Sequence, residues 1–540
     1  MRSLRNIFRL IRAGRILARY DALFPPEFED DVPPIVKAGR AVAAVRLPWE
    51  AKPKADGSIA ERLSTALQTL GPSYIKLGQF LATRPDIIGT ELAGDLGMLR
   101  DRLPPFDQSV AVATIESELG APISELYVEF GEPVAAASIA QVHKASIAIA
   151  ERTEGDGPEG LTYRDVAVKV LRPGVETRFA QDLDSFFWIA ETVEKRQPAA
   201  RRLRPVEVVQ TLADSVELEM DLRLEAAAMS EMAQNTAHDT DFRVPEIDWE
   251  RTSRRVMTLE WVDGTPATDR DALVAAGHDM AALGTRTIQT FLTHALRDGF
   301  FHADMHQGNL FVDPDGTLVA VDFGIMGRLD QRSRRFLAEI LYGFVRRDYR
   351  RVAEIHFEAG YVPDDKNIDT FAQALRSIGE PIFGKTAKDV SMGRLLAQLF
   401  LVTDQFDMAT RPELILLQKT MVVVEGVARH FDPEHNIWDS AEPILAAWMA
   451  ERLGPEGRIQ DAADGAAALG RAVTHLPDFL DRADRVARQV SESVDRDGIR
   501  LHPSTADAIA RAQSNRNRWS HAALWVGAAS LFVLALTAVV

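Results

Sequence analysis

A chain of 540 residues is too long for a single hydrophobic core, so we expect about two to four domains or subdomains. The chain contains no cysteine, which excludes disulfide scaffolds, thiolate zinc sites, iron–sulfur clusters and cysteine nucleophiles. Its net charge of −17 argues against nucleic acid as a partner, because the body of the protein would repel a polyphosphate.

The first twenty residues are strongly basic and contain no acidic side chain. At about 100° per residue, a helix turns an apolar face away from an arginine face. The apolar face holds Leu4, Ile7, Phe8 and Ile11, and the arginine face holds Arg2, Arg5, Arg9 and Arg12. Such a helix can lie on an anionic membrane surface or pack against the acidic body, and both interpretations of the segment 1–57 stay open. No cleaved secretory signal is expected, because no uninterrupted apolar run follows the arginines.

The next segment, 58–125, is predicted to be helical, with breaks at Gly71-Pro72 and Pro104-Pro105. Short runs typical of strands follow, and a long helical stretch over 175–234, broken near Pro198 and Pro205, separates the third run from the fourth. The predicted strands cover 127–130, 138–147, 165–171, 243–247 and 255–262.

From Asp263-Gly264 onward the pattern is mostly helical, apart from a small strand pair over 310–312 and 318–321. Strands with one long helical stretch, then a helical lobe with a polar loop and a strand pair, are the layout of a bilobal protein kinase. We therefore predict an α+β fold with a kinase-like N-lobe over 126–262, inserted helices included, and a kinase-like C-lobe over 263–450. A helical polar linker is predicted over 451–520.

The last residues form an apolar run, and 522–540 contains no charge. At about 1.5 Å per residue, a helix of this length nearly spans a hydrocarbon core of about 30 Å. Arginines precede the run, and Trp519 and Trp525 lie near one boundary, which would keep the preceding body on the cytoplasmic side. A buried core helix is the alternative. Because no later segment could cover it, we predict a single-pass transmembrane anchor over 521–540.

Gly155, Gly157 and Gly160 match the G-x-G-x-x-G fingerprint of dinucleotide sites. That fingerprint requires a strand before the glycines and a helix after them, so that the pyrophosphate meets the helix N-terminus. Here a predicted strand follows, and the nearby carboxylates of Glu151 and Asp156 would repel phosphate. We therefore predict a surface hairpin loop.

Two polar motifs in the predicted C-lobe are typical of phosphoryl transfer. Asp304 and Asn309 have the D-x-x-x-x-N spacing of a kinase catalytic loop, and Asp322 begins a D-F-G triplet beyond the strand pair. The reaction needs a carboxylate that orients or deprotonates the nucleophile and two oxygen ligands that hold Mg²⁺ against the phosphates. We assign the first role to Asp304 and the metal-binding role to Asn309 and Asp322.

Upstream, Val166-Ala167-Val168-Lys169 resembles the V-A-I-K strand of kinases, whose lysine holds the α- and β-phosphates of ATP. A lysine within an apolar strand is costly unless it is paired. Glu225, in the long helical stretch, is the predicted partner. Taken alone, Lys169 would fit a solvated lysine on an edge strand equally well.

The segment in the position of a glycine-rich loop contains no glycine. It reads Val134-Ala135-Ala136-Ala137-Ser138-Ile139-Ala140-Gln141-Val142. Methyl groups restrict positive φ angles and hinder a close approach of the backbone to phosphate, both of which glycine permits. The catalytic loop also reads His-Ala-Asp instead of His-Arg-Asp, and no Ala-Pro-Glu follows D-F-G. Regulation by a phosphorylated activation loop is therefore not expected.

Over about residues 1–450, these features resemble the UbiB family of atypical protein-kinase-like proteins, also called the ADCK family, and most of all its bacterial ubiquinone-biosynthesis members. The segment 134–142 matches the family's alanine-rich replacement for the glycine-rich loop. Lys76-Leu77-Gly78-Gln79 matches its K-x-G-Q signature, and Glu219-Met220-Asp221 matches its E-x-D signature. The resemblance assigns an ATP-site lysine, its glutamate partner, a catalytic aspartate and two metal ligands to Lys169, Glu225, Asp304, Asn309 and Asp322. Two differences are Gln307, where proline is common, and one apparent C-terminal span, where two often occur.

The resemblance further implies that the K-x-G-Q helices form a regulatory lid over the nucleotide site and obstruct a protein substrate. Lys76, with Gly78 and Gln79 beside it, would close this lid by pairing with Glu219 or Asp221. A plain surface helix cap explains the same four residues equally well without the resemblance.

The cofactors that the resemblance implies are ATP and Mg²⁺. The implied partners are membrane lipid, prenylated phenolic quinone precursors and ubiquinone-biosynthesis enzymes, and a homodimer stays open. The implied location is the bacterial inner membrane, with the catalytic body on the cytoplasmic side.

The leading hypothesis is a membrane-anchored ATPase or small-molecule kinase that supports ubiquinone biosynthesis. The alanine-rich segment and the missing motifs argue against a conventional Ser/Thr protein kinase. The intact Lys169, Asp304, Asn309 and Asp322 argue against a nucleotide-binding scaffold without activity. A flavin-dependent hydroxylase lacks a credible dinucleotide fingerprint. Water, a prenylated phenolic lipid and a protein all stay open as the phosphoryl acceptor.

Overall fold

The structure is a computed structural model that describes residues 2–20, 59–82, 96, 103–151, 160–196, 204–381, 402, 405–408 and 412–453. Nearly all of these residues belong to one compact unit, Met1–Ala450. Most of the predicted linker, 451–520, and the whole predicted anchor, 521–540, lie outside the described residues. Among the residues that the structure does describe, none of the helices has the length and apolar character needed to span a bilayer.

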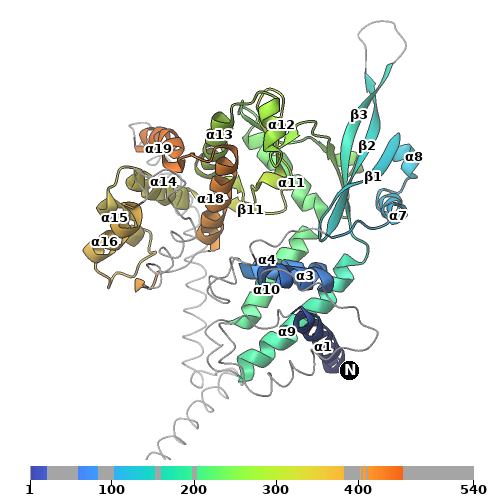
Figure 1. The fold of residues 1–540 in the computed structure, drawn as a ribbon, viewed down its shortest axis with the longest axis horizontal. Coiled ribbons are helices and arrows are strands. Elements are labelled where there is room, and N and C mark those ends of the chain that lie inside the picture. Colours follow the sequence, from blue (N-terminus) through green and yellow to red (C-terminus); the bar gives the residue numbers. More distant parts are fainter. Residues whose placement is uncertain are drawn as a thin grey trace, which may run out of the picture. The chain divides into compact units, whose positions relative to one another are not determined.

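The N-lobe is built on an antiparallel sheet of five strands in the order β1-β2-β3-β6-β5. Figure 1 shows β1, β2 and β3 side by side. Its strands are β1 (Glu129–Ala136), β2 (Ala140–Glu151), β3 (Gly160–Leu171), β5 (Ile247–Asp248) and β6 (Val256–Glu260). Side chains alternate between the two faces of a strand. In β3, Val166, Val168 and Val170 are fully buried in a cluster that includes Ile115 of α7 (Gln108–Leu119) and residues next to α8 (Ile123–Leu126). The alternation turns Lys169 to the opposite face of the sheet.

The strand predicted after the glycine fingerprint is confirmed, while the surface loop itself, 152–159, lies outside the described residues and stays a prediction. Glu151 at the end of β2 pairs with Gly160 at the start of β3. A strand therefore follows the glycines, where a dinucleotide site needs a helix.

The long helical stretch between β3 and β6 forms three helices: α9 (Val175–Arg196), α10 (Pro205–Glu219) and α11 (Leu222–Asn235). The predicted breaks near Pro198 and Pro205 agree with the end of α9 and the start of α10, where Pro205 takes the first helical position. The sequence reasoning missed a third break after α10. There Asp221 caps the N-terminus of α11, because its carboxylate accepts a hydrogen bond from the backbone N–H of Arg223.

Among the described residues, the helices α1 (Arg2–Arg19), α3 (Ile59–Leu70) and α4 (Pro72–Ala82) precede α7 and the N-lobe sheet. The predicted break at Gly71-Pro72 is confirmed, and Gly71 adopts a φ of 110° that favours glycine. Helix α1 contacts α9 and α3 (Figure 1). The interpretation of the basic segment as a helix packed against the body is therefore confirmed for Arg2–Arg19.

The C-lobe contains two small sheets that carry the polar motifs. The first has the order β4-β10-β9-β7, and the second pairs β8 with β11. These strands are β4 (Phe242–Arg243), β7 (Thr265–Pro266), β8 (Phe300–His302), β9 (Leu310–Val312), β10 (Leu318–Ala320) and β11 (Met326–Arg328). The predicted pair of β9 and β10 is confirmed. The sequence reasoning missed β7, β8 and β11, because strands of two or three residues carry almost no periodic pattern.

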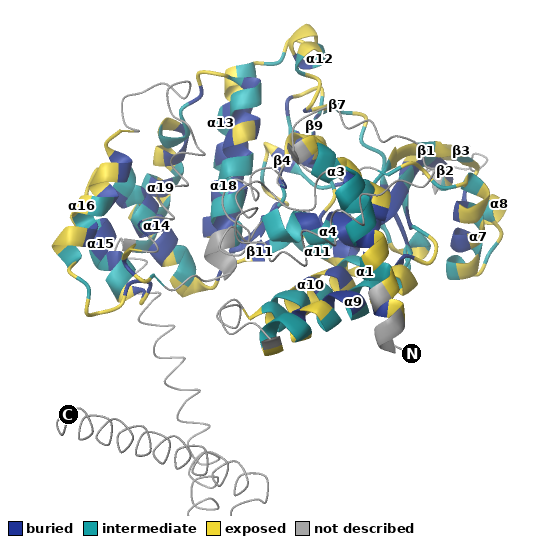
Figure 2. Cartoon of the chain, turned by 60° about the horizontal axis from the view of Figure 1, so that its bottom comes forward, coloured by how far each residue is buried: buried dark blue, intermediate teal, exposed yellow. Residues whose placement is uncertain are grey.

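The longer elements of the C-lobe, as far as the structure describes it, are helices. They are α12 (Arg270–Ala275), α13 (Met280–Thr293), α14 (Gln331–Val345), α15 (Tyr349–Glu358), α16 (Ile368–Gly379), α18 (Pro412–Phe431) and α19 (Ile437–Leu453). Helix α13 packs against α18, and Figure 2 shows buried residues along α13 in contrast to the exposed surface of α12. Buried residues of both helices join the core that also contains β8, β9 and β10.

Candidate functional site

The structure brings Lys169 of β3, Glu225 of α11 and Asp322 together. The Nζ atom of Lys169 lies 2.7 Å and 2.9 Å from the two carboxylate oxygens of Glu225 and 3.1 Å from Oδ1 of Asp322. The side chains of Lys169 and Glu225 are only 13% and 8% exposed. The Lys169–Glu225 pairing that the sequence suggested is present, and the solvated edge-strand alternative is wrong, because β3 lies between β2 and β6.

Burial and charge act in opposite directions within this cluster. Burial raises the pKa of Glu225 to about 7, although the ammonium group of Lys169 opposes the shift. The same ammonium group holds the pKa of Asp322 well below its usual range. Burial by itself would lower the pKa of Lys169, but the carboxylates of Asp322 and Glu225 outweigh it and raise that pKa. Lys169 is therefore a permanent cation, beside a carboxylate that stays ionised.

Asp322 has an unusual backbone conformation. Its φ angle is 62°, in the left-handed region that residues other than glycine rarely adopt. The next residue, Phe323, is buried, and its ring lies 4.9 Å from the ring of His302. This contact fixes the D-F-G triplet beside the catalytic loop, while the carboxylate of Asp322 stays 49% exposed and accessible to a ligand.

The catalytic loop after β8 is held by two internal hydrogen bonds. The backbone N–H of Asp304 donates to Nδ1 of His302 at 3.1 Å, and Nδ2 of Asn309 donates to the backbone oxygen of Asp304 at 3.1 Å. Nε2 of His302 lies 3.3 Å from the backbone oxygen of Val321, which assigns the ring proton to Nε2. Burial lowers the pKa of His302, so the neutral ring is favoured. His302 thus positions Asp304, a role that the sequence reasoning did not assign.

A threonine from a distant helix also supports this loop. The Oγ1 atom of Thr420, on α18, lies 3.0 Å from the backbone oxygen of Ala303, the residue before Asp304. The Thr420 side chain is fully buried, and its hydroxyl also contacts the backbone oxygen of Leu416 at 2.8 Å. No signal in the sequence points to Thr420, because it lies more than a hundred residues from the loop and outside any motif.

The alanine-rich segment, which takes the position of a glycine-rich loop, is mostly strand with a short turn in the middle. Strand β1 extends to Ala136, β2 begins at Ala140, and the backbone N–H of Ala137 donates to the oxygen of Ala140 at 2.8 Å. Only a tight turn at Ser138-Ile139 separates the strands. None of residues 134–142 has a positive φ angle, which explains why the turn forms without glycine.

One side chain from outside the segment and one from within it stabilise this turn and the strand after it. Arg172, just after β3, donates from Nε and Nη2 to the backbone oxygen of Ala137 at 3.0 Å and 2.9 Å. The Gln141 side chain is buried and hydrogen bonded to the backbone of Phe106 and, at 2.9 Å, to Nε2 of His143. The side chain of Gln141 therefore has a structural role. A contact between Val134–Val142 and the nucleotide stays a prediction.

Lys76 of α4 also approaches the cluster. Its Nζ lies 2.6 Å from Oε2 of Glu219, and both side chains are largely buried. The charge of Lys76 also contributes to the low pKa of Asp322. Of the two predicted partners, Glu219 pairs with Lys76, and Asp221 caps α11 and pairs with Arg223 at 2.6 Å. Because Lys76–Gln79 lie inside α4, with Gly78 buried, the helix-cap alternative is wrong.

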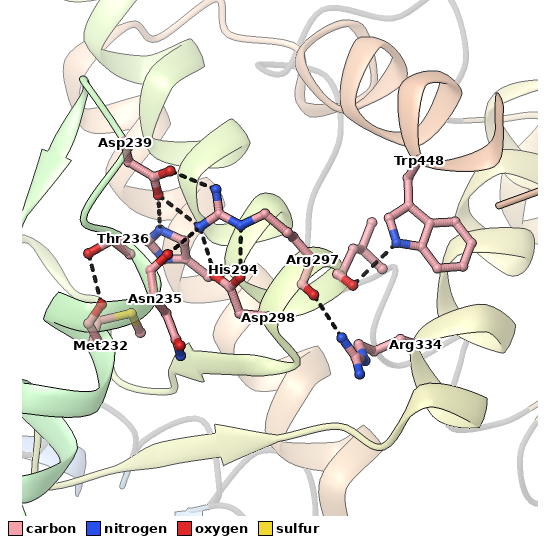
Figure 3. Close-up of polar contacts among 10 residues, drawn as sticks. Met232, Asn235, Thr236, Asp239, His294, Arg297, Asp298, Arg334 and Trp448 are labelled. Atoms are coloured by element: carbon pink, nitrogen blue, oxygen red, sulfur yellow. Dashed lines mark hydrogen bonds and ion pairs between the residues drawn. The ribbon is translucent and has the colours of Figure 1, made fainter. Parts of the chain in front are cut away.

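The opposite end of α11 is clamped to the C-lobe (Figure 3). Asp239 accepts hydrogen bonds from Arg297 at 2.6 Å and 3.0 Å, and Nε2 of His294 lies 3.3 Å from the same carboxylate. Arg297 also donates to the backbone oxygen of Asn235, the last residue of α11. These contacts fix the helix that carries Glu225 relative to the π-helical turn His294–Asp298.

The side chains at the predicted metal site have the right chemistry for Mg²⁺. That ion prefers carboxylate and amide oxygens. Asp322 supplies a half-exposed carboxylate, and Asn309 uses its amide nitrogen for Asp304, which leaves its carbonyl oxygen available. Asn309 and Asp322 would therefore hold the ion, with Lys169 beside them for phosphate.

Comparison with known proteins identifies the class and then the family. Residues 98–356 match the sequence profile of the ABC1 atypical kinase-like domain, and residues 375–436 match the UbiB helical domain, which includes Thr420. The chain is thus an atypical kinase-like protein with a mixed helix and sheet fold.

Bacterial relatives with the name "Probable protein kinase UbiB" match most of the chain. The protein from Marinobacter nauticus is 39% identical over 452 residues, which cover 83% of this chain and 78% of that protein. The protein from Pseudomonas entomophila is 38% identical over 484 residues, covering 88% and 86%. A solved structure, the complex of Rv3197 with erythromycin from Mycobacterium tuberculosis, is 25% identical and covers 74% of this chain and 96% of that one, with a TM-score of 0.46. The chain belongs to the UbiB family, which confirms the resemblance seen in its motifs.

Proposed function

We propose that the chain is a membrane-anchored atypical kinase or ATPase that binds Mg-ATP and supports ubiquinone biosynthesis as a regulator of the aromatic-ring modification steps. The observation that carries the proposal is the cluster of Lys169, Glu225 and Asp322 beside the loop of Asp304 and Asn309. A buried lysine held by two carboxylates is costly to maintain for stability alone, whereas it suits a site that receives phosphates.

In the proposed reaction, Lys169 binds the α- and β-phosphates, and Glu225 holds the lysine in place. Asp304 orients the attacking hydroxyl or water and accepts its proton, because its backbone is fixed by His302 and Asn309 while its side chain is partly exposed. Mg²⁺, when bound by Asn309 and Asp322, would neutralise phosphate charge.

The lid, the membrane and the partners belong to the same proposal. Lys76 pairs with Glu219 and acts on Asp322 through its charge, so α4 is suited to limit access of a protein substrate. Water or a prenylated phenolic lipid is then the preferred acceptor. Anchoring of 521–540 in the bacterial inner membrane, with the catalytic body on the cytoplasmic side, would bring the site to such lipids and to ubiquinone-biosynthesis enzymes.

The test is nucleotide turnover by the purified full-length chain, with and without liposomes and a phenolic lipid analogue. Phosphate release and lipid phosphorylation are measured separately, and Asp304→Asn is the control for contaminating activity. We expect Mg²⁺-dependent turnover that lipid stimulates and that Asp304→Asn abolishes. ATP binding without turnover in every condition would instead support the scaffold, and transfer to an added protein substrate would support a conventional kinase.

A further inference from the structure

Helix α1 has two different faces, and within the part of the chain that the structure describes only one of them is buried against the body of the protein. Asn6 and Ala13 are buried, whereas Arg5, Phe8, Ile11 and Arg12 are exposed. At about 100° per residue, the exposed residues occupy the side of the helix opposite Asn6 and Ala13. The predicted separation of an apolar face from an arginine face is therefore incomplete, because both kinds of side chain point outward.

The buried face fixes how α1 is oriented. Nδ2 of Asn6 donates to Oδ2 of Asp184 on α9 at 3.0 Å, and the hydroxyl of Ser185 donates to Oδ1 of Asn6 at 3.3 Å. Arg9 adds hydrogen bonds to Gln181 on the same helix. These polar contacts specify one rotation of α1, so the direction of its outer face is set by the fold.

The outer face combines exposed apolar side chains with positive charge. Phe8 is 70% exposed and Ile11 is 59% exposed, although burial of such side chains is strongly favoured. Arg5 and Arg12 flank them, and helical geometry places Arg15 and Arg19 on the same arc. No acidic residue occurs in α1, in a chain whose net charge is −17.

We propose that this outer face of α1 is a docking surface for an anionic lipid bilayer, with Phe8 and Ile11 inserted at the level of the headgroups and the arginines bound to lipid phosphates. The combination of apolar and arginine side chains on one helical face suits a surface that is negatively charged outside and apolar beneath. A second copy of the chain is a poor partner for this face, because two α1 helices would oppose arginine to arginine.

This inference deepens the membrane association in the proposed function, because it adds a structured contact at the other end of the chain from 521–540. It does not depend on nucleotide turnover. The contact is expected to be sensitive to salt, since screening weakens attraction between exposed charges, whereas an inserted apolar span is not.

The absence of cysteine from the chain allows a direct test in the full-length protein. A nitroxide label is attached to Ile11→Cys, and to Val274→Cys on α12 as a matched exposed control. Each protein is reconstituted into vesicles of phosphatidylcholine alone or with phosphatidylglycerol, and access of oxygen and of a water-soluble nickel chelate is measured. We expect the label at residue 11, and not that at 274, to lose access to nickel and gain access to oxygen only in the anionic vesicles.

A second variant tests the arginines without disturbing the buried face. Arg5→Ala combined with Arg12→Ala should lower the fraction of labelled residue 11 in the lipid-exposed state by about fivefold for each arginine removed. Raising the salt concentration should act in the same direction. Unchanged thermal unfolding in detergent would show that α1 is still docked on α9.

Full access of nickel to residue 11 in anionic vesicles would overturn the proposal. Protection of residue 11 from nickel that is equal in neutral vesicles would also overturn the proposal. Protection that appears without lipid and grows with protein concentration would overturn it as well and indicate a protein partner. Alkaline carbonate extraction tests separately whether 521–540 anchors the protein, and phosphate release tests whether it turns over ATP. A negative result in either assay can therefore be distinguished from the absence of a membrane contact at α1.

Discussion

Replacing Thr420 by valine tests whether α18 supports the catalytic loop. Valine has nearly the shape of threonine, so the change removes a buried hydroxyl without a large cavity. The backbone oxygen of Leu416 can still accept the helical hydrogen bond from residue 420, but the oxygen of Ala303 loses the donor that lies 3.0 Å away. A buried acceptor that loses its donor costs about 1–3 kcal/mol. We expect the free energy of unfolding to fall by an amount in this range.

The matched control is Thr287→Val on α13. Thr287 is also fully buried, but its hydroxyl contacts the backbone oxygen of Leu283 within its own helix, at 2.8 Å. Urea unfolding and ATP hydrolysis are measured for both variants and for Thr420→Ser. Thr420→Val should lower kcat about tenfold, because release of Ala303 displaces the neighbouring Asp304. Thr420→Ser should restore most of kcat, and Thr287→Val should leave it unchanged. If Thr420→Val and Thr287→Val behave alike in both assays, α18 does not position the loop.

Three further predictions concern charge. Asp322→Asn should weaken Mg-ATP binding at least tenfold, whereas Asp304→Asn should mainly lower turnover. If calorimetric titration shows equal losses of Mg-ATP binding for both variants, the roles assigned to these two aspartates are wrong. Hydrogen bonds from His294 and Arg297 outweigh burial and hold the pKa of Asp239 below its usual range. Asp239→Asn should therefore lower the free energy of unfolding by about 1 kcal/mol at pH 7. In urea unfolding, the difference in this free energy between the variant and the wild type should shrink as the pH falls below about 4. Burial lowers the pKa of His356 to about 4, so the fold favours the neutral ring. The stability that this ring contributes is fully present above pH about 6.5. As the pH falls from there toward 4, at most about 3 kcal/mol of the free energy of unfolding is lost. In His356→Phe, which keeps the ring contacts, the slope of unfolding free energy with pH should become shallower by this share, whereas the buried rings of His143, His302 and His435, whose pKa values burial also lowers, keep their contributions.

The sequence predicted those parts of the site that local spacing determines. Asp304 and Asn309 lie in one loop, and Asp322 follows after a short strand pair, so their order along the chain already places them near one another. Lys169 was identified by its resemblance to the V-A-I-K motif, and Glu225 was predicted as its partner on the long helical stretch because a charge in an apolar strand requires one. Motif and burial arguments agree at these positions.

The sequence reasoning missed the contacts that single residues make across long distances. Thr420 and Arg172 each contribute one side chain to a backbone oxygen elsewhere, and neither belongs to a repeating pattern. The break after α10 was missed because Asp221, interpreted as a lid residue, acts as a helix cap. The segment 134–142 takes the position of the glycine-rich loop of kinases, and only its residues 138–142 were predicted to be strand, whereas strands cover both 134–136 and 140–142.

The break at Asp221 also explains how the parts of the site are connected. Glu219, which pairs with Lys76, lies at the end of α10, and Glu225, which pairs with Lys169, lies in the first turns of α11. The far end of α11 is clamped at Asp239. A helix of 14 residues is about 20 Å long and stiff, so its two ends cannot move independently. Glu219 belongs to α10, and only Met220 and Asp221 separate it from the first residue of α11. A displacement of the end of α10 away from Lys76 therefore acts next to the first turn of α11, which holds Glu225 against Lys169, while the far end of α11 stays clamped.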